Sequence, residues 1–250
     1  MSNTTHHLVI VTGASRGLGL AVARLLLARP GTRVLAIARR PSEALAADVD
    51  ASRLEQWSQD LAQPLEAAQR LEAWLGAIAP GAFARASLVN NAGVITPPGP
   101  LRDTPAEALS NAIRVGLEAP LLLTAAFLRA TRDWPADRRV LNVSSGLGRR
   151  AMAGSAAYCA AKAGMDHFSR AVALEGERIV SLAPGVIETD MQAQLRGADP
   201  AAFPERERFV QLKTGGLLDS PEAAAAKLVA CLDRADFGAN PVADVRDPAS

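Results

Sequence analysis

The sequence predicts a single α/β domain in which helices cover both faces of a doubly wound, mostly parallel, seven-stranded sheet. Short β-branched runs alternate with longer Ala/Leu-rich segments, which is the pattern of βαβ units. The first short run passes directly into a glycine-rich loop. The chain has 250 residues, 49% of them hydrophobic, and shows neither an internal repeat nor a linker. One domain over residues 1–250 therefore accounts for the chain.

The elements follow one another in the order that such a sheet requires. Breakers such as Pro30-Gly31 and Ala79-Pro80-Gly81 separate them. Strands are expected at residues 8–12, 33–38, 54–59, 87–90, 139–144, 178–182 and within 241–245. Helices are expected at residues 17–29, 64–78, 105–130, 155–175 and 221–233. This order predicts a three-layer α/β/α Rossmann fold, whose ligands bind at the carboxyl ends of the strands.

Composition argues against several classes of function. Lys plus Arg number 27 and Asp plus Glu 26, so the net charge of +1 gives no reason to expect nucleic acid or an anionic membrane as partner. Cys159, Cys231 and the three histidines form neither a disulfide pattern nor a metal site. The polar N-terminus does not have the pattern of a signal peptide. We therefore expect a cytoplasmic protein without a metal.

A glycine-rich loop, TGASRGLG, occupies residues 12–19 directly after the first strand. Glycines let the backbone turn tightly and approach a pyrophosphate at the N-terminus of the following helix. The spacing is G-x-x-x-G-x-G, and such turns also have purely structural uses, so the loop alone is a weak signal. We predict cofactor contacts at Gly13, Ser15, Arg16, Gly17, Leu18 and Gly19.

The second strand ends in Ala38-Arg39-Arg40, where an NAD site would carry an acid for the ribose 2′-hydroxyl. Arginines suit the 2′-phosphate of NADP(H), and Arg16 can reach the same group. The alternative is a pair of solvated arginines at a strand end. We predict NADP(H), which disfavours an NAD-linked alcohol dehydrogenase.

Tyr158 is the only tyrosine in the chain, and Lys162 follows it by four residues on a predicted helix. We expect the lysine ammonium to lower the pKa of the phenol, which could then exchange a proton with a substrate oxygen. A Tyr-x-x-x-Lys pair is also common on ordinary helix surfaces. The wider pattern carries more weight, because six features follow predicted strands and should share one rim of the sheet: Gly13, Arg39, Asp60, Asn91, Ser145 and Pro184.

With these motifs the chain resembles the classical short-chain dehydrogenase/reductase family along nearly its whole length. The matching motifs are Thr12-Gly13-x-x-x-Gly17-x-Gly19, Asp60-Leu61, Asn90-Asn91-Ala92-Gly93, Ser145, Tyr158-x-x-x-Lys162 and Pro184-Gly185. The resemblance implies that Tyr158 is the general acid/base, that Lys162 lowers its pKa and holds the nicotinamide ribose, and that Ser145 binds the substrate oxygen. It further implies that Asp60 binds adenine and that the cofactor channel is lined by Leu61, Asn91, Ala92, Gly93, Pro184, Gly185, Ile187, Thr189 and Met191.

A narrower resemblance, to the sepiapterin reductase and benzil reductase branch, appears in the segments 183–192, 220–222 and 226–228. It implies NADPH-dependent reduction of vicinal dicarbonyls or related ketones. Asp244 falls where sepiapterin reductase places an acid against its pterin, although an exposed strand-end aspartate is the alternative. A substrate loop is expected at about residues 189–215.

One residue departs from the family pattern. Gly116 stands where the family has an asparagine whose backbone holds a water of the proton relay. Glycine could still kink the helix and offer a carbonyl to water, or it could impair the relay. A non-catalytic NADP(H)-binding sensor or scaffold is therefore the alternative to a reductase. Family members also pair through long central helices, which implies a homodimer or homotetramer.

Overall fold

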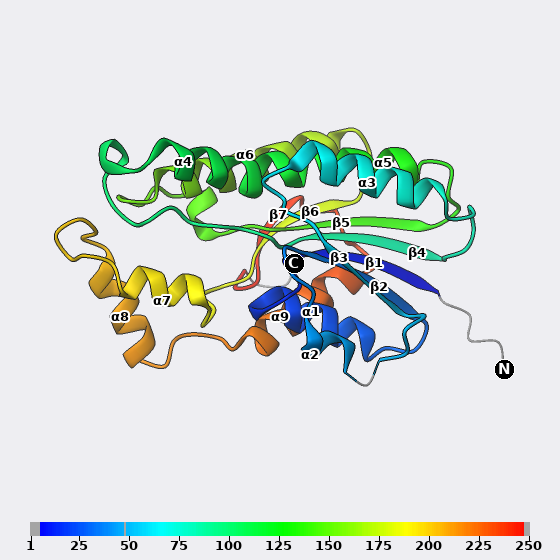
Figure 1. Ribbon diagram of the computed structural model, residues 1–250, viewed down its shortest axis with the longest axis horizontal. Helices are drawn as coiled ribbons and strands as arrows, with labels where there is room; N and C mark the ends of the chain where they lie inside the picture. Colours follow the sequence, from blue (N-terminus) through cyan, green and yellow to red (C-terminus); the bar gives the residue numbers. More distant parts are fainter. Residues whose placement is uncertain (1–5, 48, 248–250) are drawn as a thin grey trace.

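The computed structural model describes residues 6–47 and 49–247, and these form the expected sheet between two layers of helices (Figure 1). Its strands run in the order β3-β2-β1-β4-β5-β6-β7, and every pairing is parallel. The order reverses between β1 and β4, so a crevice opens at the carboxyl ends of these two strands. The strands are β1 His7–Thr12, β2 Thr32–Ala38, β3 Leu54–Ser58, β4 Arg85–Asn90, β5 Asp137–Val143, β6 Ile179–Ala183 and β7 Val242–Asp244.

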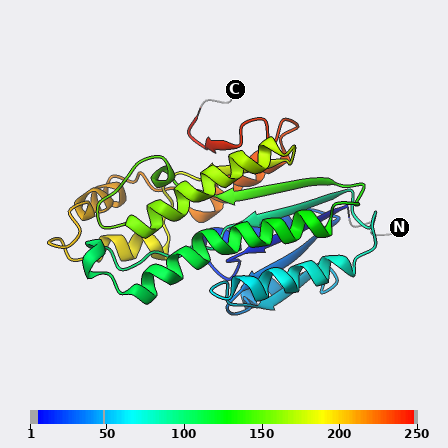
Figure 2. The same cartoon turned by 90° about the horizontal axis from the view of Figure 1, so that it is seen from above.

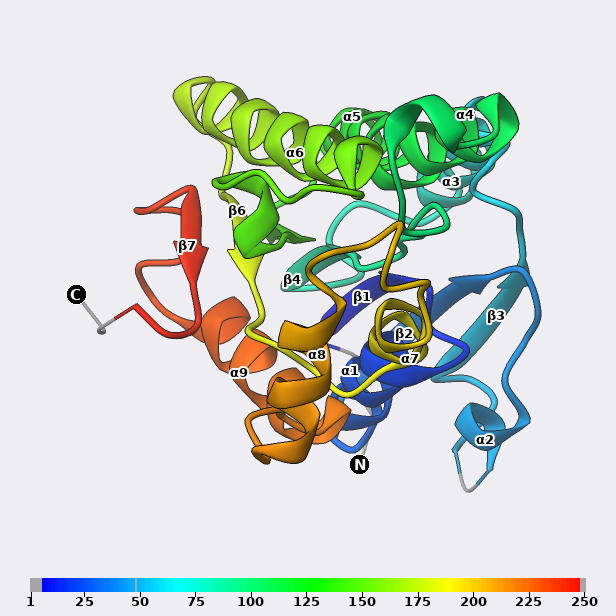
Figure 3. The same cartoon turned by 90° about the vertical axis from the view of Figure 1, so that its left-hand side faces the viewer.

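Helices cover both faces of the sheet. One layer holds α3, α4, α5 and α6, and the other holds α1, α2 and α9 (Figure 1). The short helices α7 and α8 lie beyond the carboxyl ends of the strands, in the predicted substrate loop (Figure 3). The helices are α1 Gly17–Leu27, α2 Glu43–Ala46, α3 Pro64–Gly76, α4 Ala106–Ile113, α5 Ala119–Ala130, α6 Ala156–Leu174, α7 Asp190–Arg196, α8 Arg206–Thr214 and α9 Pro221–Asp233.

Strand β1 shows why a nearly continuous apolar run becomes a buried strand. Successive side chains of a strand point to opposite faces. Val9 and Val11 join the apolar core beneath α1 and α9. Leu8 and Ile10 join the core beneath α3 and α5. A strand covered on both faces needs apolar residues at every position, and this need fixes β1 at the centre of the sheet.

The long central helix is not α-helical throughout. Between α4 and α5 lies a π-helical turn, Arg114–Glu118, that contains Gly116. The whole helix, Ala106–Ala130, is long and apolar enough to cross a membrane, but half of its most apolar 18-residue stretch is buried inside the protein. It packs against α3 and runs beside α6 above the sheet (Figure 2), which accounts for its composition.

Candidate active site

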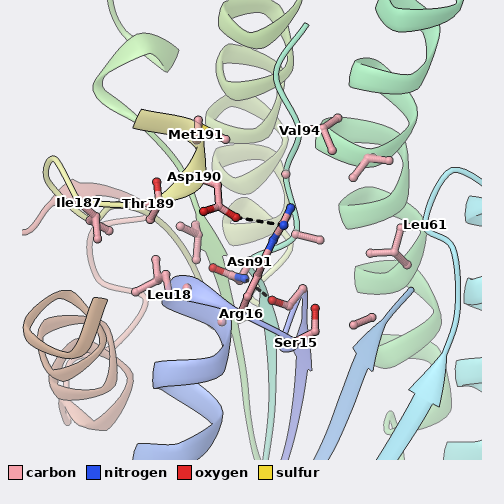
Figure 4. Close-up of a pocket in the computed structure, with 18 of the residues that line it drawn as sticks. Ser15, Arg16, Leu18, Leu61, Asn91, Val94, Ile187, Thr189, Asp190 and Met191 are labelled. Carbon is pink, nitrogen blue, oxygen red and sulfur yellow. Dashed lines mark hydrogen bonds and ion pairs between the residues drawn. The ribbon is translucent and has the colours of Figure 1, made fainter. Parts of the chain in front are cut away.

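One cavity of about 1080 Å³ opens at the carboxyl ends of the strands. All six rim features predicted from the sequence lie in its wall. Figure 4 shows one of them, Asn91, beside the glycine loop. The wall contains every residue proposed to bind cofactor or act in catalysis, namely Gly13, Ser15, Arg16, Gly17, Leu18, Gly19, Arg39, Arg40, Asp60, Leu61, Asn91, Ala92, Gly93, Ser145, Tyr158, Lys162, Pro184, Gly185, Ile187, Thr189 and Met191.

The glycine loop has the close packing that a dinucleotide loop requires. Gly13 has φ +68°, a conformation that favours glycine. A Cβ on Gly19 would lie 2.3 Å from the carbonyl oxygen of Gly13, so no side chain fits there. The Asn91 amide donates to the Thr12 carbonyl at 2.9 Å and ties this loop to the one after β4. These contacts leave the backbone at the N-terminus of α1 facing the cavity, a geometry that suits a pyrophosphate.

Three arginines line the same cavity: Arg16 in the glycine loop, and Arg39 and Arg40 after β2. Arg16 forms an ion pair of 3.0 Å with Asp190, the first residue of α7 (Figure 4). Both side chains are about 70% exposed, so this pair contributes little stability and leaves the guanidinium available to a ligand. The cavity wall at the end of β2 holds Ala38 where an NAD site would hold an acid.

Ser145, Tyr158 and Lys162 meet in the wall of this cavity. Ser145 follows the end of β5, and the other two lie one turn apart near the start of α6. A hydrogen bond joins the Tyr158 and Ser145 side chains. The Lys162 Nζ lies 5.7 Å from the centre of the Tyr158 ring and donates to the Val143 carbonyl at 2.6 Å. A substrate oxygen placed against Ser145 would therefore also be next to the only phenol of the chain.

Burial governs the electrostatics of this site in the protein without cofactor. Burial raises the pKa of Tyr158, and the hydrogen bond from Ser145 only partly opposes that effect. Burial also lowers the pKa of Lys162 to about 8, while the charge of Asp166 acts in the opposite direction. Lys162 is not among the causes that act on the pKa of Tyr158 in the protein without cofactor. The prediction that Lys162, together with the positive nicotinamide, lowers the pKa of the phenol concerns the complex and stays a prediction.

Comparison with known proteins assigns the chain to a family. The family model for short chain dehydrogenases matches residues 7–200. The chain belongs to the short-chain dehydrogenase family of oxidoreductases. It is 35% identical over 237 residues to a benzil reductase ((S)-benzoin forming) of Bacillus cereus, covering 92% of this chain and 95% of that protein. It is 32% identical over 252 residues to the sepiapterin reductase of Meriones unguiculatus, with 95% of each covered.

Solved structures agree with that assignment. A metagenomic short-chain oxidoreductase in complex with NADP superposes with a TM-score of 0.70 at 27% identity, over 97% of this chain and 96% of that one. Short-chain dehydrogenases of this fold bind nicotinamide cofactors, so the glycine loop, the rim and the Ser-Tyr-Lys group of this chain occupy a nicotinamide-binding architecture.

The predicted substrate loop contributes to a buried apolar cluster. Met152, Leu195, Phe203 and Phe209 form a buried cluster against which Leu147 and Cys159 pack. The last two are close in sequence to Ser145 and Tyr158. The aromatic rings of Phe203 and Phe209 stack at 5.9 Å between centroids. The cluster packs the predicted substrate loop against the segment between Ser145 and Tyr158, and none of these described residues lines the cavity.

Asp244 lies at the end of β7 and outside the residues that line the cavity. Its carboxylate accepts hydrogen bonds from Arg246, one of them at 2.5 Å, and forms an ion pair of 3.5 Å with Arg149. These arginines lower the pKa of Asp244 and already use its oxygen atoms. Its predicted contact with a substrate remains a prediction.

The structure adds residues that sequence reasoning missed. Asn111 of α4 and Gln192 of α7 line the cavity, and the Gln192 Oε1 is buried without a hydrogen-bond partner. Asp166 lies one turn beyond Lys162, a spacing that the sequence displays as Tyr-x-x-x-Lys-x-x-x-Asp. Gly116 faces α6, since a Cβ on it would lie 3.1 Å from the Cβ of Ala161.

Proposed function

We propose that the chain is an NADPH-dependent carbonyl reductase that converts a ketone or vicinal dicarbonyl to a secondary alcohol, with Tyr158 as general acid/base. The convergence of Ser145, Tyr158 and Lys162 on one cavity supports the reaction. Arg16, Arg39 and Arg40, which line the same cavity, support NADP(H) as the cofactor. A non-catalytic sensor would have no use for the intact catalytic group.

The cofactor side follows from the charges and glycines of the wall. When bound, NADPH supplies the hydride. The glycine loop and the N-terminus of α1 would hold its pyrophosphate, and Arg16, Arg39 and Arg40 would pair with its 2′-phosphate. Asp60 and Leu61 would hold the adenine. Lys162, Asn91, Ala92 and Gly93 would line the ribose channel, and Pro184, Gly185, Ile187, Thr189 and Met191 the nicotinamide end.

The protein side chains supply the proton and the orientation. Ser145 would donate a hydrogen bond to the substrate carbonyl oxygen and hold it against the phenol. Because burial raises the pKa of Tyr158, its hydroxyl keeps its proton at neutral pH and is ready to donate it as negative charge develops on that oxygen. The Lys162 ammonium would favour the resulting phenolate.

The relatives of the chain support one class of substrate. A relative is named for reduction of benzil, an aryl dicarbonyl. We therefore propose aryl-substituted vicinal dicarbonyls as the preferred class, ahead of small ketones and pterins.

Two measurements test the function. First, oxidation of NADPH is followed by its absorbance with a panel of diketones, quinones and pterins, and an aryl diketone should give the highest kcat/KM. Second, Tyr158→Phe should lower kcat by roughly 10²–10⁴-fold, the usual contribution of a general acid. NADPH affinity should stay unchanged, because the phosphate contacts remain. A variant that keeps more than about a tenth of the wild-type kcat would refute the role of Tyr158.

The remaining expectations are proposals about the setting of the enzyme. The near-neutral charge supports a cytoplasmic protein without nucleic acid or membrane as partner. The family resemblance supports a homodimer or homotetramer formed through the long helices α4–α5 and α6.

A further inference from the structure

Asp166 is a buried acid with no part in the reaction described above. It is 1% exposed, on the face of α6 that packs on the sheet. Its Oδ1 accepts hydrogen bonds from the hydroxyls of Ser144 at 2.5 Å and of Ser181 at 2.7 Å. Its Oδ2 is buried without a hydrogen-bond partner. A carboxylate that is buried and half satisfied is costly, so its presence calls for a compensating use.

One use is visible in the turn that carries Ser145. Ser144, which donates to Asp166, immediately precedes the catalytic serine. On the other side of the turn, a Cβ on Gly148 would lie 2.7 Å from the Asp166 Oδ2, so the turn packs directly against this oxygen. Asp166 therefore contacts the Ser144–Gly148 segment on both sides of Ser145 and limits where the serine hydroxyl can point.

A second use concerns Lys162, which lies one helical turn from Asp166. Two effects act on the lysine: burial disfavours its cation, and the charge of Asp166 favours it. Among the described residues, the other elements around the amine bring no charge to it. The loop after β4 offers Gly93, whose added Cβ would lie 4.0 Å from the Nζ. Strand β5 offers the Val143 carbonyl, and α6 itself offers the Tyr158 ring and the Met165 sulfur.

We propose that Asp166 is a positioning residue for the reduction: its carboxylate fixes the turn that presents Ser145 and supplies the negative charge that keeps Lys162 cationic. This inference rests on the proposed function, because it concerns the same catalytic group. Asp166 touches neither substrate nor cofactor in this assignment and acts through its two neighbours.

The test is Asp166→Asn in the full chain. The variant keeps an oxygen for the Ser144 and Ser181 hydroxyls and removes only the charge. Ser181→Ala is the matched control, because it removes one hydrogen bond to Asp166 and leaves the charge in place. For each protein, kcat for NADPH oxidation with an aryl diketone and NADPH affinity by fluorescence are measured from neutral to alkaline pH. Far-UV circular dichroism verifies folding.

Wild-type kcat should fall at alkaline pH as Lys162 loses its proton. In Asp166→Asn this fall should begin about one pH unit lower, as loss of a unit charge one helical turn away can cause in a protein interior. NADPH affinity should show the same displacement, because Lys162 holds the ribose. Ser181→Ala should keep the wild-type profile.

If Asp166→Asn is folded and its pH profiles of kcat and of NADPH affinity both match wild type, the proposal is overturned, whatever the thermal stability of the variant. An equal shift of the pH profiles in Ser181→Ala would also overturn it, because the shift would then result from the lost hydrogen bond and not from the lost charge. A wild type that oxidises no NADPH with any carbonyl would count against the proposed function instead. The pH profile of NADPH affinity would still decide the role of Asp166 in that case.

Discussion

His7 makes the stability of this fold sensitive to mild acid. It is the first residue of β1, 9% exposed, and its Nε2 lies 2.8 Å from the Ser87 hydroxyl. Burial, assisted by the positive charge of Arg85, lowers its pKa from 6.5 to about 4. The folded protein therefore binds this proton more weakly than the unfolded chain. The contribution of His7 to stability is complete above about pH 6.5 and is lost as the pH falls toward 4.

The magnitude follows from the two pKa values. A difference of about 2.5 units corresponds to roughly 3 kcal/mol once both forms are protonated, and about 2 kcal/mol of this is lost by pH 5. Urea unfolding measures this loss of unfolding free energy between pH 7.5 and pH 5 at fixed protein concentration. The fluorescence of the buried Trp57 and Trp134 follows the transition. His7→Gln retains a group for the Ser87 bond but cannot titrate.

The expected result is a difference between variants. Between pH 7.5 and pH 5, the free energy of unfolding of wild type should fall by about 2 kcal/mol more than that of His7→Gln. His6→Gln is the matched control, because His6 is exposed and adjacent, and it should behave like wild type. Equal losses in wild type and His7→Gln would refute the reasoning, since the acid sensitivity would then come from other groups.

Three further predictions concern the site. Arg39→Asp should weaken NADPH binding far more than NADH binding, by about tenfold or more if one charge-assisted pair is lost. A fluorescence titration that finds equal losses of affinity for the two cofactors would contradict the NADP(H) assignment. Gly116→Asn should keep or raise kcat. Gly116→Ala introduces the same 3.1 Å crowding against Ala161 without the amide, so a loss of kcat in both variants would reflect packing alone. Asp244→Ala should raise KM for a pterin and leave a diketone unaffected if that residue contacts substrate, whereas equal effects on both would exclude the contact.

Most of the fold could be predicted because its signals are local. Apolar runs such as residues 8–11 and breakers such as Pro30-Gly31 set the elements, and their predicted ends lie within two residues of the observed ones. Helices α2, α7 and α8 were missed, because short loop helices depend on packing more than on sequence periodicity.

The cavity wall could be predicted as well, because residues after parallel strands must share one rim. The electrostatics could not. Whether Lys162 or burial governs the pKa of Tyr158 depends on how deeply each group lies, and spacing along a helix does not contain that information. The same holds for Asp166, whose partners are Ser144, directly after β5, and Ser181 in β6, which are distant from each other in sequence.

The position of the only tyrosine has a practical consequence. The other side chains of this protein that absorb in the near ultraviolet through a benzene or indole ring are phenylalanine and tryptophan, and neither ionises in water. The ultraviolet absorbance that accompanies phenol ionisation therefore comes from Tyr158 alone, without background from other sites. The protonation state of the proposed acid can be followed directly, in the free protein and as cofactor and inhibitors are added, with no label and no substitution.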